Sequence, residues 1–312
     1  MVFAFFSDGK LIKAPTLGII LQQTAVLAAL AIGQTLIVIT AGVDLAVGTG
    51  MVLTHLVVAK VFSEWGVPAV VALLIGLVVG LSLGAFHGFL ITKIGLPPFI
   101  TTLGTFYIFQ SLGLTYSQAR TIGKADLGDK AATKGYDGLL LWTGKEITFG
   151  ARRTGFTITV GVILVFLMYL AFTYVLNNTA WGSHVYATGD DLEAARLAGI
   201  NVNRVLVSVY MVAGALYAFG AWIQLGRSLS ASSNAGDGQI NLDTITAVVI
   251  GGTSLFGGRG RFSGTLIGAL VVSVFRLGLT LSGVSAYWQT FAIGSLILIA
   301  VSLDQWIRKV AK

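Results

Sequence analysis

Long apolar stretches separated by short polar segments dominate the chain. Crossing about 30 Å of hydrocarbon as a helix takes roughly 20 apolar residues. Six stretches reach that length, at 17–40, 67–91, 97–117, 155–176, 205–226 and 284–303. Acidic residues, lysine and arginine are absent from all six, so each is predicted to form a membrane-spanning helix.

Three shorter apolar stretches border on charged residues. They run at 45–59, 244–258 and 262–275, next to Asp44, Asp243 and Arg276. Each becomes a further span if the neighbouring charge is tolerated, which gives nine spans in all. Glycine, serine and threonine are scattered along these stretches, as is typical of membrane helices that pack closely.

The first fifteen residues resemble the end of a longer segment. The apolar stretch 2–6 is too short for the core of a signal peptide, and no basic region precedes it. We therefore expect the sequence to start late, with the first helix truncated. One additional helix upstream would bring the total to ten.

Composition agrees with a membrane protein. Of the 312 residues, 55% are hydrophobic and 11% charged, and the mean hydropathy is +0.86. Soluble chains carry about 25% charged residues. The net charge of +7 is dispersed between apolar stretches and forms no basic stripe with stacking aromatics, so nucleic-acid binding is not expected. The chain contains no cysteine, which excludes disulfides and thiol chemistry.

Lysine and arginine in short loops predict the orientation. Placing the 177–204 loop and the C-terminus in the cytoplasm puts eight basic residues there and four on the other side. The polar stretch 118–154 then lies outside, with seven basic and four acidic residues. We give it little weight because long loops of mixed charge influence topology less than residues next to the spans.

The two halves of the chain share a pattern. Each contains a span, a polar interruption with glycine and aspartate, and a shorter span; the interruptions lie at 40–45 and 234–243. With the upstream helix, five spans would lie on each side of the loop and the halves would cross the membrane in opposite directions. We predict an all-α polytopic membrane protein with a first half at 1–117, a periplasmic loop at 118–154 and a second half at 155–312.

A short capped helix is predicted within the loop 181–204. Asp190 is suited to be the N-cap, Glu193 can return a carboxylate as in a capping box, and Gly199 can end the helix in a left-handed conformation. Two interpretations remain open. The helix is either an interfacial connector or a docking site for a soluble partner.

The glycine-rich segment 251–264 only superficially resembles a phosphate-binding loop. Gly252 and Gly257 have the required spacing, but Gly258 stands where a Walker-type loop needs lysine. Any energy from ATP must therefore enter through another polypeptide. The segment is predicted to be a tight basic turn on the inner side.

Ionisable residues within membrane segments are candidates for function. Asp44 can cap the next helix or contact a solute, and Asp243 is its counterpart in the second half. Arg276 can reach the interface, pair with an acid or line a polar path. His55 and His87 fit packing better than metal binding, because neither has a second ligand at helical spacing.

Neutral polar residues at membrane depth suit an uncharged polyhydroxylated solute, and suit helix-to-helix contacts equally well. With the charged candidates they make up the predicted substrate pathway. That pathway comprises Gln34, Asp44, Thr101, Thr102, Gln110, Asn234, Asp243 and Arg276. No metal site is predicted. The enzyme class is disfavoured because the chain has neither a G-x-S-x-G nor an H-E-x-x-H motif.

Three runs of sequence carry a resemblance to a known family. The runs at 39–48, at 187–202 (ATGDDLEAARLAGINV) and at 247–268 (AVVIGGTSLFGGRGRFSGTLIG) are similar to ribose/xylose/fructose-type permeases of bacterial ABC sugar importers. The resemblance implies a multi-pass protein of the bacterial inner membrane with about ten helices per subunit.

The resemblance also implies partners. They are a cytoplasmic ABC ATPase, a periplasmic sugar-binding protein and a second permease subunit, identical or paralogous. ATP and Mg²⁺ would bind to the ATPase, and this chain would hold no cofactor. The helix at 190–199 would be the coupling helix that docks on the ATPase. Its predicted coupling residues are Gly189, Asp190, Asp191, Glu193, Ala194, Ala195, Gly199 and Ile200.

The expected function is monosaccharide import by alternating access. The alternative from another class is an ion-coupled secondary transporter, which would need Asp44 and Asp243 to bind H⁺ or Na⁺. A purely structural membrane protein would conduct no solute.

Overall fold

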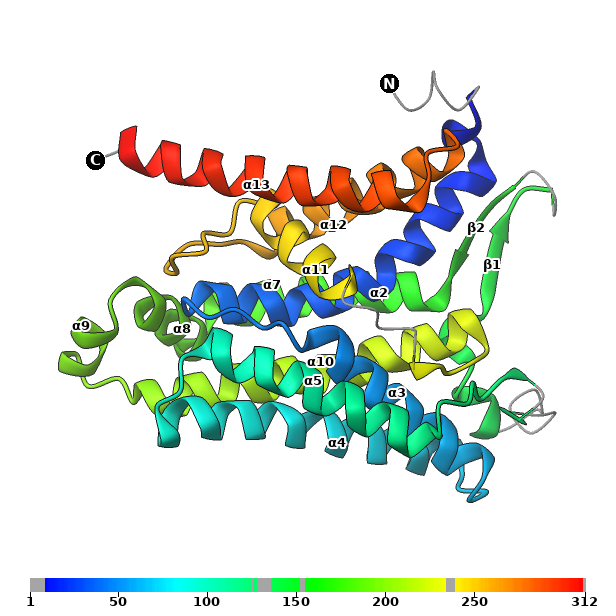
Figure 1. The fold of residues 1–312 in the computed structure, drawn as a ribbon, viewed down its shortest axis with the longest axis horizontal. Helices are drawn as coiled ribbons and strands as arrows, with labels where there is room; N and C mark the ends of the chain where they lie inside the picture. Colours follow the sequence, from blue (N-terminus) through cyan, green and yellow to red (C-terminus); the bar gives the residue numbers. More distant parts are fainter. Residues whose placement is uncertain (1–8, 125, 128–135, 152–154, 234–238, 311–312) are drawn as a thin grey trace.

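The computed structural model describes residues 9–124, 126–127, 136–151, 155–233 and 239–310. Most of its helices run between two ends of the molecule (Figure 1). We call these the α9 end, where α9 (Leu192–Leu197) protrudes, and the hairpin end, where strands β1 (Glu146–Phe149) and β2 (Phe156–Thr159) lie.

Each of the nine predicted apolar stretches contributes to a helix, but the span expected at 244–258 was wrong at its end, because the helix stops at Ile250 and the glycine-rich turn follows. The longer ones are α2 (Ala14–Ile39), α4 (Ala69–Phe89), α5 (Pro98–Ser117), α7 (Val160–Asn178), α10 (Val202–Ser228), α12 (Phe262–Leu281) and α13 (Ala286–Val310). The shorter ones are α3 (Val47–Ser63) and α11 (Gln239–Ile250). Among the described residues, five helices are long and apolar enough to cross a membrane. The predicted helical, polytopic architecture is confirmed.

The expected loop contains a small sheet that the all-helical prediction omitted. Strands β1 and β2 pair antiparallel, with Glu146 opposite Thr159 and Phe149 opposite Phe156. The span expected at 155–176 therefore begins only at Val160, because Phe156 to Thr159 belong to the strand. Short 3-10 turns at Tyr136–Leu139 and Trp142–Gly144 precede the hairpin.

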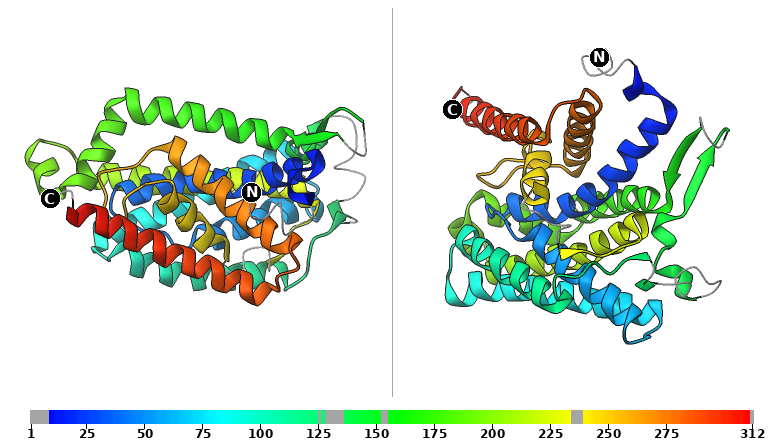
Figure 2. Two further views of the ribbon diagram at one scale, coloured as in Figure 1. Left: turned by 90° about the horizontal axis from the view of Figure 1, so that it is seen from above. Right: turned by 45° about the vertical axis from the view of Figure 1, so that its right-hand side comes forward.

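Helix α2 runs through the middle of the bundle. Within the most apolar 18-residue segment of α2, 67% is buried, compared with 28% of the corresponding segments of α4 and α7. It packs against α10, α11, α12 and α7, and seen from above α12 lies between α7 and α13 (Figure 2). Because it is apolar all round, α2 is suited to this buried position.

Helices α3 and α11 begin inside the bundle and not at one of its ends. Helix α2 finishes at the α9 end, and the chain then turns back inward before α3 runs to the hairpin end (Figure 1). Helix α10 finishes at the hairpin end, and α11 runs from the interior toward the α9 end, which the loop after it reaches. The two half-length helices thus point in opposite directions, as an inverted repeat requires.

Glycines bring α4 and α10 into backbone contact. A Cβ atom at Gly80 would overlap the carbonyl oxygen of Gly214, and one at Gly84 would overlap the carbonyl oxygen of Tyr210. The spacing of Gly80 and Gly84 places both on one face of α4. Small residues at such positions allow the close packing that holds membrane helices together.

We expect Gly80→Ala to destabilise the protein. Its methyl group has no room against the Gly214 carbonyl, and forcing extra volume into a packed core costs about 1–3 kcal/mol. The readout is the thermal aggregation midpoint of the purified protein in one detergent. Gly104→Ala on α5 is the control, because its Cβ would meet nothing within 4 Å. Equal midpoints for the two variants would contradict the close-packing argument.

Candidate functional site

The interruption between α2 and α3 is built around the fully buried carboxylate of Asp44. Its Oδ1 accepts a hydrogen bond from the backbone N–H of Ala46 at 2.7 Å, just before α3 begins. Its Oδ2 accepts one from the hydroxyl of Tyr217 on α10. Asp44 therefore holds the entry to α3 and ties that entry to α10. It is not the helix cap that the capping interpretation expected, because Ala46 is the N-cap residue of α3.

Two other predicted residues hold the same segment. The buried Gln34 amide faces the backbone of Asp44. In the amide orientation that satisfies both groups, its nitrogen donates to the Asp44 carbonyl at 3.2 Å and its oxygen accepts from the Asp44 N–H at 3.3 Å. The hydroxyl of Thr102 donates to the carbonyl of Val43 at 3.0 Å. The structure thus brings Gln34, Asp44 and Thr102 together around the interruption, where each satisfies a buried polar group.

The membrane histidines are fully buried. Nε2 of His87 lies 2.6 Å from the hydroxyl of Thr105, and its ring centre lies 5.9 Å from that of Tyr210. His55 has no hydrogen-bond partner among the described residues. Within the same residues no group of three or more His, Asp or Glu side chains could hold a metal ion.

The N-termini of the two half-length helices meet. The side-chain oxygen of Asn241, in the first turn of α11, accepts a hydrogen bond from the backbone N–H of Gly48 in the first turn of α3, at 2.5 Å. Asn241 is 3% exposed, so this contact lies inside the bundle. An N-terminal N–H of α3, which the helix itself cannot satisfy, is thereby paired by a residue of the other half of the chain.

A cavity of about 370 Å³ lies beside this meeting point, between α2, α3, α10, α11 and α12. We call it the Asp243 cavity. In its wall Arg276 Nη2 lies 2.7 Å from Asp243 Oδ2, and Arg276 Nη1 donates to Gln239 Oε1 at 2.9 Å. Of the three roles considered for Arg276, pairing with an acid is observed, and the same side chain also lines the polar cavity.

Sequence reasoning missed most of the polar residues of this cavity. Besides Asp243 and Arg276, its polar lining consists of Gln23, Gln224, Arg227, Gln239 and Ser273. The available signal was a glutamine or arginine near the end of an apolar stretch. Nothing in the sequence indicated that residues of four different helices converge.

The remaining predicted pathway residues lie elsewhere. Thr101 donates to the Pro97 carbonyl of its own helix at 3.1 Å, and Gln110 is half-buried on α5. Neither lines the Asp243 cavity. Asn234 lies outside the described residues. Their part in a pathway stays a prediction.

Helix α9 follows α8 (Ala180–Asp190) and protrudes beyond the bundle. The predicted N-cap was wrong by one residue. Asp190 still belongs to α8, and Asp191 is the cap: its Oδ1 accepts from the N–H groups of Glu193 at 2.9 Å and Ala194 at 3.0 Å. Glu193 does not return to the cap and instead pairs with Arg196 at 2.7 Å.

The end of α9 follows the prediction. Gly199 has φ +83°, in the left-handed region. Its N–H donates to the Arg196 carbonyl at 3.0 Å, and the N–H of Ile200 donates to the Ala195 carbonyl at 3.0 Å. These two bonds form a Schellman motif. Ala195 packs inward, whereas Leu197 is 90% exposed.

Three segments of backbone meet at the C-terminal end of α8. We call this contact, which is formed by Gly189, Gly257, Gly258 and the backbone of Ile39, the glycine junction. The N–H of Gly258 donates to the carbonyl of Ile39, the last residue of α2, at 2.9 Å. A Cβ atom at Gly189 would overlap that same carbonyl, and one at Gly257 would overlap the Gly189 carbonyl. The tight turn predicted for 251–264 thus connects α8 and α9 to the end of α2.

Comparison with known proteins identifies the family. Residues 16–301 match the family model described as branched-chain amino acid transport system / permease component. The chain is 43% identical over 311 residues to the fructose import permease protein FrcC of Rhizobium meliloti, covering 100% of this chain and 83% of that protein.

Other curated relatives are also import permeases. Identity to the ribose import permease protein RbsC of Escherichia coli K12 is 37% over 285 residues, or 91% of this chain and 84% of that protein. Identity to the galactose/methyl galactoside import permease protein MglC of the same strain is 33% over 319 residues, or 97% and 90%. No solved structure matches the chain. The chain, a multi-pass protein of the inner membrane, therefore belongs to the permease family of ABC sugar importers.

Proposed function

We propose that this chain conducts a monosaccharide across the membrane by alternating access, through the Asp243 cavity. The supporting observation is the contact between Asn241 and Gly48, which joins the starts of two interrupted helices next to a polar cavity. Transporters built from inverted repeats bind solutes where such half-helices meet. The relatives that import fructose, ribose and galactose make a monosaccharide the solute class.

The chemistry of the cavity suits a neutral polyhydroxylated solute. Gln23, Gln224 and Gln239 offer both donors and acceptors, and Ser273 offers a hydroxyl. At about 30 Å³ for each water molecule, 370 Å³ has room for about a dozen waters, which a sugar ring with its hydroxyls can replace.

Helix α9 is the proposed docking site for a cytoplasmic ABC ATPase. Leu197 presents an exposed apolar side chain at the tip, and Asp191 and Gly199 fix both ends of the helix. The glycine junction would pass a displacement of α8 and α9 to the end of α2. Because the Asp44 interruption follows α2 directly, the same displacement reaches α3.

With the ATPase on α9, the positions of the other partners follow. The hairpin end would face the periplasm and a sugar-binding protein, and the α9 end would face the cytoplasm. A second permease subunit would cover the exposed aromatic faces of α5 and α13, which carry Phe99, Tyr107, Trp288 and Phe291. ATP and Mg²⁺ would bind to the ATPase and not to this chain.

The carboxylates that ion coupling would need are already engaged. Both oxygens of Asp44 accept hydrogen bonds from the protein, and Asp243 pairs with Arg276. Neither carboxylate offers a free site for Na⁺ or H⁺ in this conformation. ATP-driven transport is therefore favoured over the secondary-transporter alternative.

We expect Leu197→Gln to weaken ATPase binding by about 30-fold, because losing a central apolar anchor of an interface costs about 2 kcal/mol. The measurement is the affinity of the purified permease for its ATPase subunit. Phe149→Gln at the hairpin end is the control, since Phe149 is also an exposed apolar residue. Unchanged affinity in the Leu197 variant would contradict docking on α9.

A charge-removal series tests the Asp243 cavity. Arg276→Gln should impair both stability and uptake, because it leaves a mostly buried carboxylate unpaired at a cost of about 3–5 kcal/mol. Arg276→Gln combined with Asp243→Asn removes both charges and should restore stability while uptake stays at least about tenfold low, a loss of about 1.4 kcal/mol. Full recovery of uptake in the double variant would show that the pair only supports the fold.

Energy coupling is tested in proteoliposomes that contain permease, ATPase and binding protein. Uptake should continue when ionophores dissipate the H⁺ and Na⁺ gradients, and should stop when ATP is withdrawn. Asp44→Asn should keep this pattern, because it alters the entry to α3 and not an ion site. Uptake that survives without ATP and collapses with the gradients would refute the ABC importer assignment.

A further inference from the structure

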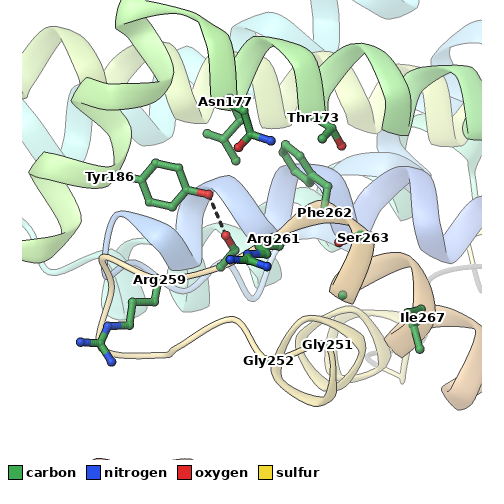
Figure 3. Close-up of a pocket in the computed structure, with 13 residues that line it drawn as sticks. Thr173, Asn177, Tyr186, Gly251, Gly252, Arg259, Arg261, Phe262, Ser263 and Ile267 are labelled. Carbon is green, nitrogen blue, oxygen red and sulfur yellow. Dashed lines mark hydrogen bonds between the residues drawn. The ribbon is translucent and has the colours of Figure 1, made fainter.

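A second cavity, of about 910 Å³, opens at the α9 end between α7, α8 and the start of α12. We call it the Arg261 cavity. Figure 3 shows Asn177 and Thr173 approaching from α7, Tyr186 from α8, and Arg261 lying between Tyr186 and Ser263. It shares no lining residue with the Asp243 cavity.

Two arginines give this cavity a positive charge. Arg259 and Arg261 both line it, and the ion pairs formed within the described ranges involve other basic residues. Tyr186 donates a hydrogen bond to the Gly260 carbonyl at 2.7 Å. Burial raises the pKa of Tyr186, although Arg261 opposes that shift, so the phenol stays neutral and does not compensate the arginines.

The start of α12 adds to the attraction for an anion. This 20-residue helix begins after Arg261, and the side chain of that N-cap residue makes no capping hydrogen bond. The N–H groups of Phe262, Ser263 and Gly264 belong to the first turn, where a helix has no acceptor of its own. The positive end of the helix dipole therefore lies beside the guanidinium group of Arg261.

The two walls of the Arg261 cavity formed by α7 and α12 both change from polar to apolar with distance from the α9 end. On α7, Asn177 lies at the cavity, and Leu170 and Phe166 follow on the same face, each 54% exposed. On α12, Ser263 lies at the cavity and Ile267 follows one turn later, 61% exposed. A small soluble anion would match only the polar end. An amphiphile matches the whole groove.

We propose that the Arg261 cavity binds an anionic phospholipid. Arg261 and the first turn of α12 hold the phosphate, Arg259 adds positive charge at the edge of the cavity, and an acyl chain lies along the exposed apolar stripes of α7 and α12. Guanidinium groups form strong charge-assisted hydrogen bonds with phosphate oxygens. Basic pockets between membrane helices recognise anionic headgroups in this way.

The test uses the purified full-length permease with its ATPase subunit, delipidated in detergent. Phosphatidylglycerol and phosphatidylcholine with the same acyl chains are titrated in turn, and bound lipid is counted by native mass spectrometry. Phosphatidylglycerol should bind at least tenfold more tightly. In the double variant Arg259→Gln, Arg261→Gln its affinity should fall about 30-fold, since each basic residue contributes about five- to sixfold.

The control double variant is Lys93→Gln, Arg204→Gln. It removes the same net charge from exposed residues outside the cavity, and should bind phosphatidylglycerol like the wild-type protein. The thermal aggregation midpoints of both double variants should equal that of the wild type, because all four side chains are exposed.

Three results would overturn the proposal. Equal affinity for the two lipids would mean that the groove holds bulk lipid without headgroup recognition. Displacement of phosphatidylglycerol by inorganic phosphate at equal concentration would indicate a site for soluble phosphate. Wild-type lipid affinity in the Arg259→Gln, Arg261→Gln variant, together with loss of the ATPase, would assign the arginines to a protein contact.

Discussion

Two helices that begin inside the bundle impose the main constraint on this structure. A helix N-terminus carries N–H groups without partners, and the membrane interior offers no water to satisfy them. Here the protein provides the acceptors: Asn241 for Gly48 of α3, and Asp44 for the N–H of Ala46 that leads into it. The Asn241 contact connects the two halves of the chain, so the interruption in one half depends on a residue of the other.

Close backbone packing makes this arrangement possible. Glycine contacts hold α4 against α10, and α10 supplies the Tyr217 hydroxyl that binds Asp44. At the α9 end a second set of glycines joins α8 to the last carbonyl of α2. Only the C-terminal end of α2 therefore separates the surface helix α9 and its glycine junction from the buried interruption. A permease that responds to an ATPase needs a mechanical link of this kind.

Local signals in the sequence predicted much of the fold. All nine apolar stretches contribute to helices, and Gly199 ends α9 as its conformational freedom suggested. Predictions failed where two adjacent residues could serve the same role, or where the partner of a residue lies far away in the sequence. Either Asp190 or Asp191 could cap α9, and only the extent of α8 decides between them. Arg276 lies within α12 because Asp243, 33 residues away, compensates its charge.

The ion pair of Asp243 and Arg276 also has an electrical consequence. Moving one elementary charge across a membrane potential of 100 mV changes the free energy by about 2.3 kcal/mol. A carboxylate and a guanidinium group that stay paired move together, and their contributions cancel. A neutral sugar adds no charge of its own. The ion pair therefore adds no net dependence of the conformational cycle on the membrane potential.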